Sequence, residues 1–160
     1  MCPHGTTKQG FEIQFGTNHL SHFLLTTLLL DLVKKSNGRI INVSSNAAHV
    51  LVSKKEEIEG FCSFEESTVI GSCESTNVYK LYGRSKLANL IYSKKLAREL
   101  EKNGSKATTY SLNPGAVKTN LTRHFGSAVQ IFHELVTSHF FKTPWQGTQT
   151  TLQVALAPKD

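Results

Sequence analysis

Two short β-rich segments on either side of a helical segment constrain the fold of this chain more than any other feature. Residues 39–44 read Arg-Ile-Ile-Asn-Val-Ser and follow an Asn-Gly turn. Residues 107–113 read Ala-Thr-Thr-Tyr-Ser-Leu-Asn and precede a Pro-Gly pair. Short apolar runs bounded by turn residues are typical of buried parallel strands. The order strand, helix, strand predicts a βαβ unit and therefore an α/β fold.

Three helices are expected around these strands. Apolar residues recur at helical spacing over residues 9–35 and are too many for one face, which predicts a long helix covered on two sides. A second helical pattern occupies residues 77–103 and stops at an Asn-Gly pair. A third helix is expected to begin after Thr143, because Pro144 suits the first helical position and Gln146 can close a capping box.

The composition is that of an ordinary soluble globular protein. The chain has 160 residues, of which 39% are hydrophobic and 19% charged, so we expect a single domain with a proper core. The net charge is +6, but the basic residues are scattered in pairs and form no groove with interleaved aromatics. No nucleic-acid partner is therefore expected.

The cysteine positions and the hydropathy of the chain indicate in which cellular compartment it is expected. Cys2, Cys62 and Cys73 lie far apart, which argues against a disulfide framework or a metal site and for a reducing intracellular compartment. The most apolar stretch, residues 23–33, is about half of the ~20 residues that a bilayer requires. We expect a cytoplasmic chain, with membrane association only through a segment that this sequence lacks.

Two stretches are difficult to assign. Residues 46–78 mix charges, glycines and serines, and a stretch of this length is expected to be a lid, an insertion or a partly disordered loop. Residues 121–141 are rich in phenylalanine and suit an apolar flap over a lipophilic substrate, with ordinary core as the alternative. The phenylalanines are Phe125, Phe132, Phe140 and Phe141.

Tyr82 and Lys86 are candidates for acid–base chemistry. Residues four apart share one face of a helix, so the ammonium can lie near the phenol. A free tyrosine loses its proton near pH ~10, and a neighbouring cation is expected to lower that pKa. Among the four tyrosines, Tyr82 alone has a lysine four residues later. Chance spacing on a helix is the alternative, so the pair gains weight only from its neighbours in the sequence.

Three other polar motifs have structural roles as alternatives to functional ones. Ser44 and Ser45 end the first strand, at the sheet edge where open α/β sheets bind ligands, although a turn cap would also use a serine there. His19 and His22 share a helical face but have no evident third ligand, so a surface or core role is favoured over a metal. His133-Glu134 is no zinc-protease motif, because a threonine stands where the second histidine must be.

Four motifs, taken in order, resemble the short-chain dehydrogenase/reductase family, and most of all its retinol dehydrogenase-like branch. They are Asn18-His19-Leu20, Ile41-Asn42-Val43-Ser44-Ser45, Tyr82-Gly83-Arg84-Ser85-Lys86 and Asn113-Pro114-Gly115-Ala116-Val117-Lys118-Thr119. The similarity extends over nearly the whole chain. It implies a Rossmann-like, doubly wound parallel sheet and an NAD(P)-dependent oxidoreductase that acts on a lipophilic, retinoid-like alcohol or carbonyl.

The resemblance implies catalytic roles for four residues. Tyr82 would exchange a proton with the substrate oxygen, and Lys86 would lower the pKa of Tyr82 and hold the nicotinamide ribose. Ser45, the second serine of its pair, would hydrogen-bond the substrate oxygen. Asn18 would hold a water molecule of a proton relay near the lysine. Proton transfer by a tuned phenol needs no metal.

The resemblance also implies a cofactor-binding set, made of Tyr82 and Lys86 together with Pro114, Gly115, Val117 and Thr119, which would line the nicotinamide. The family holds the cofactor pyrophosphate with a strand, a glycine-rich turn and a helix. No such turn occurs in this sequence. The choice between NAD and NADP therefore stays open.

We therefore expect residues 1–160 to form a single partial domain, the catalytic half of such an enzyme without its N-terminal cofactor-binding βαβ half. A chain of this kind is expected to be inactive alone. The alternative is a non-catalytic truncated isoform that acts as an interaction partner, for example in a homodimer through its long helices.

Overall fold

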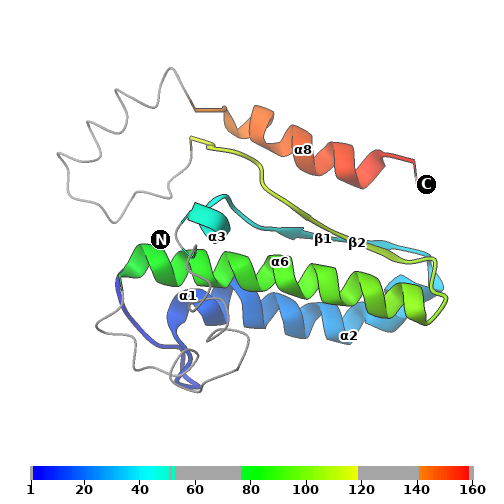
Figure 1. Cartoon of the computed structure of the whole chain (residues 1–160), viewed down its shortest axis with the longest axis horizontal. Coiled ribbons are helices and arrows are strands. Elements are labelled where there is room, and N and C mark those ends of the chain that lie inside the picture. The colour runs from blue at the N-terminus through cyan, green and yellow to red at the C-terminus, as the bar shows by residue number, and fades with distance from the viewer. Residues whose placement is uncertain (1, 51, 53–76, 119–140, 159–160) are drawn as a thin grey trace.

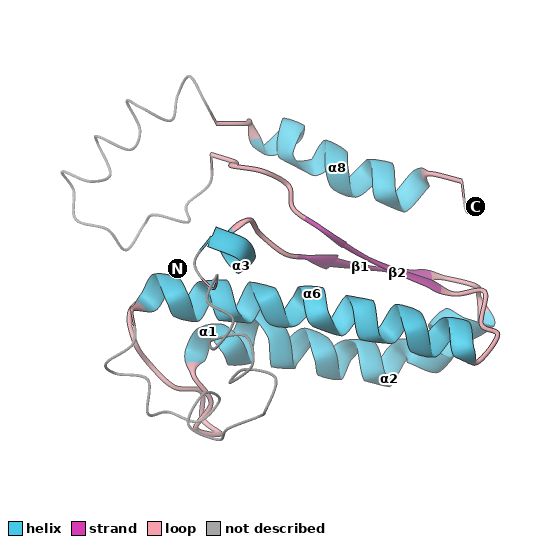
Figure 2. Cartoon of the chain, viewed as in Figure 1, coloured by secondary structure: helices cyan, strands magenta, loops and turns pink. Residues whose placement is uncertain are grey.

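The computed structural model describes residues 2–50, 52, 77–118 and 141–158. These residues form three layers (Figure 1). A two-stranded sheet lies in the middle, with helix α8 (Pro144–Leu156) on one face. The long helices α2 (Ser21–Lys35) and α6 (Val78–Lys102) cover the other face (Figure 2).

The two strands are those that the sequence predicts. Strand β1 (Arg39–Val43) pairs in parallel with β2 (Thr108–Leu112), with Val43 opposite Leu112. Helix α6 connects them, so the βαβ unit, the α/β class and the parallel sheet are confirmed. A doubly wound arrangement would need more strands than the two that the described residues contain.

Helix α6 is bounded by clear caps. Asn77 accepts a hydrogen bond from the Tyr79 backbone N–H at 2.8 Å, which satisfies one of the free donors of the first turn. The chain leaves the helix through Gly104, whose φ of +64° lies in the left-handed region that glycine adopts without strain. The buried face of α6 forms the core with its neighbours. One cluster joins Leu87 to Ala48 and Val52, and another joins Leu96, Leu100 and Ala107.

The first helical region begins later than the sequence predicts. It consists of α1 (Ile13–Phe15), a π-helical turn η1 (Gly16–Leu20) and α2, instead of one helix over residues 9–35. Glu12 caps this region, because its carboxylate accepts from the backbone N–H groups of Gln14 at 2.9 Å and Phe15 at 2.7 Å. The predicted start was wrong because this cap lies inside the apolar pattern.

The prediction that this helix is covered on two sides is also wrong for the part of the chain that the structure describes. One face of α2 lies against α6 and β1. The other face presents large apolar side chains that are 42–71% exposed. These are Leu24, Leu25, Leu28, Leu29 and Leu32; Phe23, which is 43% exposed, lies at the edge of this face and also packs against Tyr92 of α6. The periodicity counted apolar residues, but it could not identify what covers them.

Helix α8 starts as predicted. The Thr143 hydroxyl accepts from the Gln146 backbone N–H at 3.2 Å, and the Gln146 side chain accepts from the Thr143 N–H at 2.9 Å. The Arg39 guanidinium, at the start of β1, donates to the carbonyls of Val154 and Ala157 and so ties the end of α8 to the sheet. None of the helices in the described ranges is long and apolar enough to cross a membrane.

The two unassigned stretches lie mainly outside the described residues. Of residues 46–78, the structure describes a short helix α3 (Ala47–Val50) and a few flanking positions. Of the expected flap at 121–141, it describes Phe141 alone. The insertion, the flap and the single-domain boundaries therefore stay predictions.

Candidate functional site

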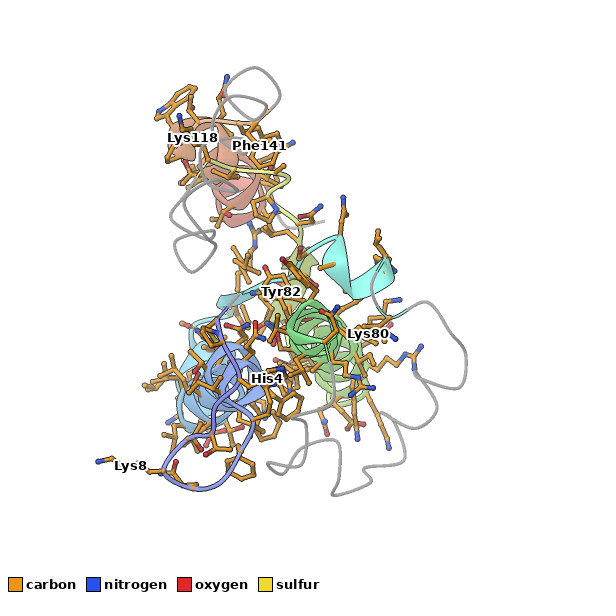
Figure 3. The ribbon with its side chains drawn as sticks, turned by 90° about the vertical axis from the view of Figure 1, so that its left-hand side faces the viewer. His4, Lys8, Lys80, Tyr82, Lys118 and Phe141 are labelled. Carbon is orange, nitrogen blue, oxygen red and sulfur yellow. The ribbon has the colours of Figure 1, made fainter. Side chains whose placement is uncertain are left out.

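The candidate site lies at the carboxyl ends of the two parallel strands, where α/β sheets bind ligands. Ser44 and Ser45 directly follow β1, and the segment 113–117 follows β2. Tyr82 and Lys86 come from the first turns of α6. Figure 3 looks toward this end of the molecule and labels Tyr82 on α6, between the α1–α2 region and α3.

The two serines point in different directions. The Ser45 hydroxyl lies close enough to the Tyr82 phenol to influence its pKa, and it accepts from the Ala47 backbone N–H at 3.2 Å. The Ser44 hydroxyl is buried and donates to the Lys86 carbonyl at 2.8 Å. This difference is expected, because consecutive residues of an extended chain point to opposite faces. Ser45 is thus the serine that lies beside the phenol.

Lys86 lies close to Tyr82 but is directed at the sheet. Its Nζ is 5.8 Å from the centroid of the Tyr82 ring. The same Nζ donates a hydrogen bond of 3.1 Å to the Val43 carbonyl, at the end of β1. The ammonium is therefore held by the strand and not by the phenolic oxygen.

The pKa of Tyr82 differs from the sequence prediction. Burial raises the pKa of Tyr82 above its ordinary value, and the hydrogen bond with Ser45 only partly opposes this rise. Burial also lowers the pKa of Lys86. The prediction that Lys86 lowers the tyrosine pKa is therefore wrong for this geometry, because loss of water disfavours both charged forms. At neutral pH the phenol keeps its proton and can act as an acid.

Asn18 lies in the π-helical turn η1 and is linked to the same part of α6. Its Nδ2 donates to the Ser85 hydroxyl at 3.0 Å, and that hydroxyl donates to the Tyr82 carbonyl at 2.7 Å. The Asn18 carbonyl accepts from Asn89 Nδ2 at 3.0 Å. The structure thus brings Asn18, Ser45, Tyr82 and Lys86 together around the start of α6.

Sequence reasoning missed a row of polar residues on the buried face of α6. Ser85, Asn89 and Ser93 are 0–5% exposed and repeat every four residues. Each has partners across the interface: Ser93, for instance, accepts from Asn42 Nδ2 at 2.9 Å. The signal was present in the sequence as polar residues at helical spacing between the leucines, but the leucines alone were used to define the face.

His19 lies at the same interface. Its ring packs against Phe15, Phe23 and Tyr92, with centroids 5.1, 6.1 and 6.1 Å away. Its Nδ1 is 2.9 Å from Asn89 Oδ1. Burial lowers the pKa of His19, so the neutral ring is favoured. His19 therefore belongs to the packed interface, in line with the core role that the sequence favoured over a metal.

The segment after β2 is held beside the end of β1. Asn113 Nδ2 donates to Asn46 Oδ1 at 2.7 Å, and Asn113 Oδ1 accepts from the Gly115 N–H at 3.2 Å. Gly115 has a φ of +85°, which favours glycine. Lys142 Nζ donates to the Pro114 carbonyl at 3.2 Å. Pro114 and Gly115 thus follow directly on a residue that is tied to the end of β1, whereas Val117 lies against Gly147 of α8 and Thr119 lies outside the described residues.

Comparisons with known proteins show which proteins the whole chain is similar to. No family model matches the chain. Retinol dehydrogenase 14 of Mus musculus is 43% identical over 159 residues, which cover 98% of this chain and 44% of that protein. Short-chain dehydrogenase TIC 32 A, chloroplastic, of Brassica napus is 38% identical over 98% of this chain and 48% of that protein.

A solved structure has a similar fold over nearly the whole of this chain. The crystal structure of an uncharacterised protein from Mycobacterium Paratuberculosis is 28% identical, with a TM-score of 0.62 over 99% of this chain and 47% of that chain. The chain spans about half the length of the curated relatives it matches. Nearly all of the residues of this chain therefore align with part of proteins named retinol dehydrogenases and short-chain dehydrogenases, and the chain resembles part of a member of the short-chain dehydrogenase/reductase family.

Proposed function

We propose that this chain supplies the proton-transfer residues of an NAD(P)-dependent oxidoreductase that acts on a lipophilic, retinoid-like alcohol or carbonyl. The observation that carries the proposal is the closeness of Ser45 and Lys86 to the half-buried Tyr82 phenol, at the carboxyl edge of parallel strands. Relatives that are named retinol dehydrogenases support the substrate class. The activity is proposed for the protein in which these residues meet a bound cofactor.

Tyr82 and Ser45 account for the proton and the substrate oxygen. With its pKa raised by burial, Tyr82 is a neutral phenol at physiological pH and can donate its proton to the oxygen of a carbonyl substrate. The Ser45 hydroxyl holds the substrate oxygen next to that phenol. In the oxidation direction the same phenol must first lose its proton, so alcohol oxidation is expected to be faster at alkaline pH.

The residues present fit the nicotinamide end of a dinucleotide. The Tyr82 phenol and the Lys86 ammonium offer a hydroxyl and a cation for ribose oxygens, and Pro114, Gly115, Val117 and Thr119 would line the ring. When bound there, the nicotinamide would accept or supply the hydride. No glycine-rich turn for the pyrophosphate occurs in these 160 residues, so we expect weak binding of NAD(P)H by this chain alone.

Asn18 completes the set as the proposed holder of a relay water. Its backbone carbonyl accepts from Asn89, and its side chain reaches Ser85, so both polar groups are fixed to α6. A fixed carbonyl near Lys86 is suited to hold a water molecule that carries protons between the lysine and solvent. The proton relay through this water is part of the proposal. So is a doubly wound parallel sheet in the protein that carries the activity.

The proposal can be tested with a chimera in which residues 1–160 replace the aligned region of mouse retinol dehydrogenase 14. We expect the folded chimera to oxidise a lipophilic primary alcohol with NAD⁺ or NADP⁺, and the parent enzyme is the positive control. A chimera that folds as the parent does but shows no turnover with either cofactor would reject the proposed function.

A second candidate is an interaction role, and the exposed apolar face of α2 favours it. Six large side chains of this helix are exposed, which is the kind of patch that protein contacts cover. We propose a homodimer through this face. Sedimentation should show concentration-dependent dimers that Leu28→Gln weakens, whereas Leu152→Gln on exposed α8 should not. A monomer at all concentrations would reject this role.

A further inference from the structure

The buried amide of Asn89 connects three elements at the site. Asn89 is 5% exposed and lies on α6, one turn beyond Lys86. Its Nδ2 is 3.0 Å from the Asn18 carbonyl in η1 and 3.4 Å from the Val43 carbonyl at the end of β1. Its Oδ1 is 2.9 Å from His19 Nδ1.

The orientation of this amide follows from its partners. Backbone carbonyls can only accept hydrogen bonds, so the end of the amide that faces both of them must be the NH₂ group. The other end is then the oxygen, which can only accept. His19 Nδ1 must therefore carry a proton and donate it to Asn89, which fixes the tautomer of the neutral imidazole.

One of these carbonyls is shared with Lys86. The Val43 carbonyl accepts from Lys86 Nζ at 3.1 Å as well as from Asn89 Nδ2. The Asn89 amide thus donates both to the Val43 carbonyl, which also binds Lys86, and to the Asn18 carbonyl. A change at Asn89 alters the surroundings of both groups without removing either side chain.

We propose that Asn89 is a positioning residue of this site, and that its single amide sets the places of the Asn18 carbonyl and of the carbonyl that holds Lys86. The inference rests on the proposed function, because Asn18 and Lys86 serve catalysis only if that function holds. A merely structural asparagine would satisfy its own buried polar atoms. Asn89 does more, since it joins η1, β1 and the ring of His19, and no other described side chain is bonded to all three.

NMR spectroscopy of the 160-residue chain tests the inference. In Asn89→Leu, a variant of similar volume that lacks the donor, the carbonyl ¹³C resonances of Asn18 and Val43 should shift. The Lys86 titration, followed at Cε, should move to higher pH because the Val43 carbonyl then serves the ammonium alone. Ser93→Ala is the matched control, because it removes a buried polar group one turn further along α6 without touching either carbonyl.

The readouts separate positioning from stability. A purely structural role predicts lower stability in both variants, with the two carbonyl resonances and the Lys86 titration unchanged in Asn89→Leu; that result would overturn the inference. Asn89→Asp is a second variant in case the leucine variant does not fold. It keeps the acceptor for His19 and loses the donor, so the same two carbonyl resonances should shift. A silent chimera would reject the proposed function, but these spectra need no turnover and would still decide the role of Asn89.

Discussion

The two long helices of this protein, α6 and α2, lie side by side in Figure 1 but differ in which side chains they bury. Helix α6 buries Ser85, Asn89 and Ser93, and each of these polar side chains has a partner. Helix α2 leaves six large apolar side chains exposed. Hydrophobicity alone therefore does not decide which side chains are buried: the polar row of α6 is buried beside its leucines and contacts residues proposed for catalysis, whereas the leucines on the outer face of α2 are exposed.

Leucine substitutions should show the largest contrast between the helices. Leu100 on α6 is 3% exposed, so Leu100→Ala should lower the free energy of unfolding by about 2–5 kcal/mol. Leu28 on α2 is 71% exposed, and Leu28→Ala should change it by less than about 0.5 kcal/mol at concentrations at which the chain is a monomer. Urea unfolding measures both. Equal losses would mean that the outer face of α2 is covered in solution.

Serine substitutions should also lower the free energy of unfolding more on α6 than on α2, but by smaller amounts. Ser93→Ala leaves the Asn42 amide without its buried acceptor, which should cost about 1–3 kcal/mol. Ser21→Ala on α2 removes an exposed hydroxyl that bonds only its own helix, and its cost should fall within about 0.5 kcal/mol. If Ser93→Ala is as mild as Ser21→Ala, the polar row contributes little to folding.

The smallest effect concerns pH and separates the two histidines of this region. The pKa of His19 is lowered by burial, so below its ordinary value of 6.5 the unfolded chain binds a proton more readily than the folded one. Stability should therefore fall as the pH drops from 6.5 through the folded-state pKa. His19→Gln should reduce this pH dependence and exposed His22→Gln should retain it, as followed by thermal unfolding. Identical profiles in all three proteins would contradict the burial of His19.

The sequence predicted what depends on neighbours along the chain. Both strands, α6 and α8 were found because turn residues, caps and a capping box mark their ends within a few positions. The site motifs were found through their resemblance to a family. The start of the first helix was missed because the carboxylate cap of Glu12 lies within an apolar stretch.

The features that the sequence did not predict depend on contacts between residues far apart in the chain. Asn18 meets Ser85 and Asn89 across separations of 67 and 71 residues, so no local pattern identifies these partners. The direction of the Tyr82 pKa shift likewise depends on burial by distant elements, whereas the sequence showed only the neighbouring lysine. Contacts between residues far apart in the chain also decide which face of α2 is covered.

The central claim is that Tyr82 carries the proton, and one pair of variants tests it directly in the chimera with mouse retinol dehydrogenase 14. Tyr82→Phe removes only the phenolic oxygen and should lower kcat for alcohol oxidation by ~10² or more with thermal stability nearly unchanged. Tyr79→Phe, nearly one turn earlier on the same helix and more exposed, is the matched control and should keep its activity. Undiminished turnover in Tyr82→Phe would contradict the claim.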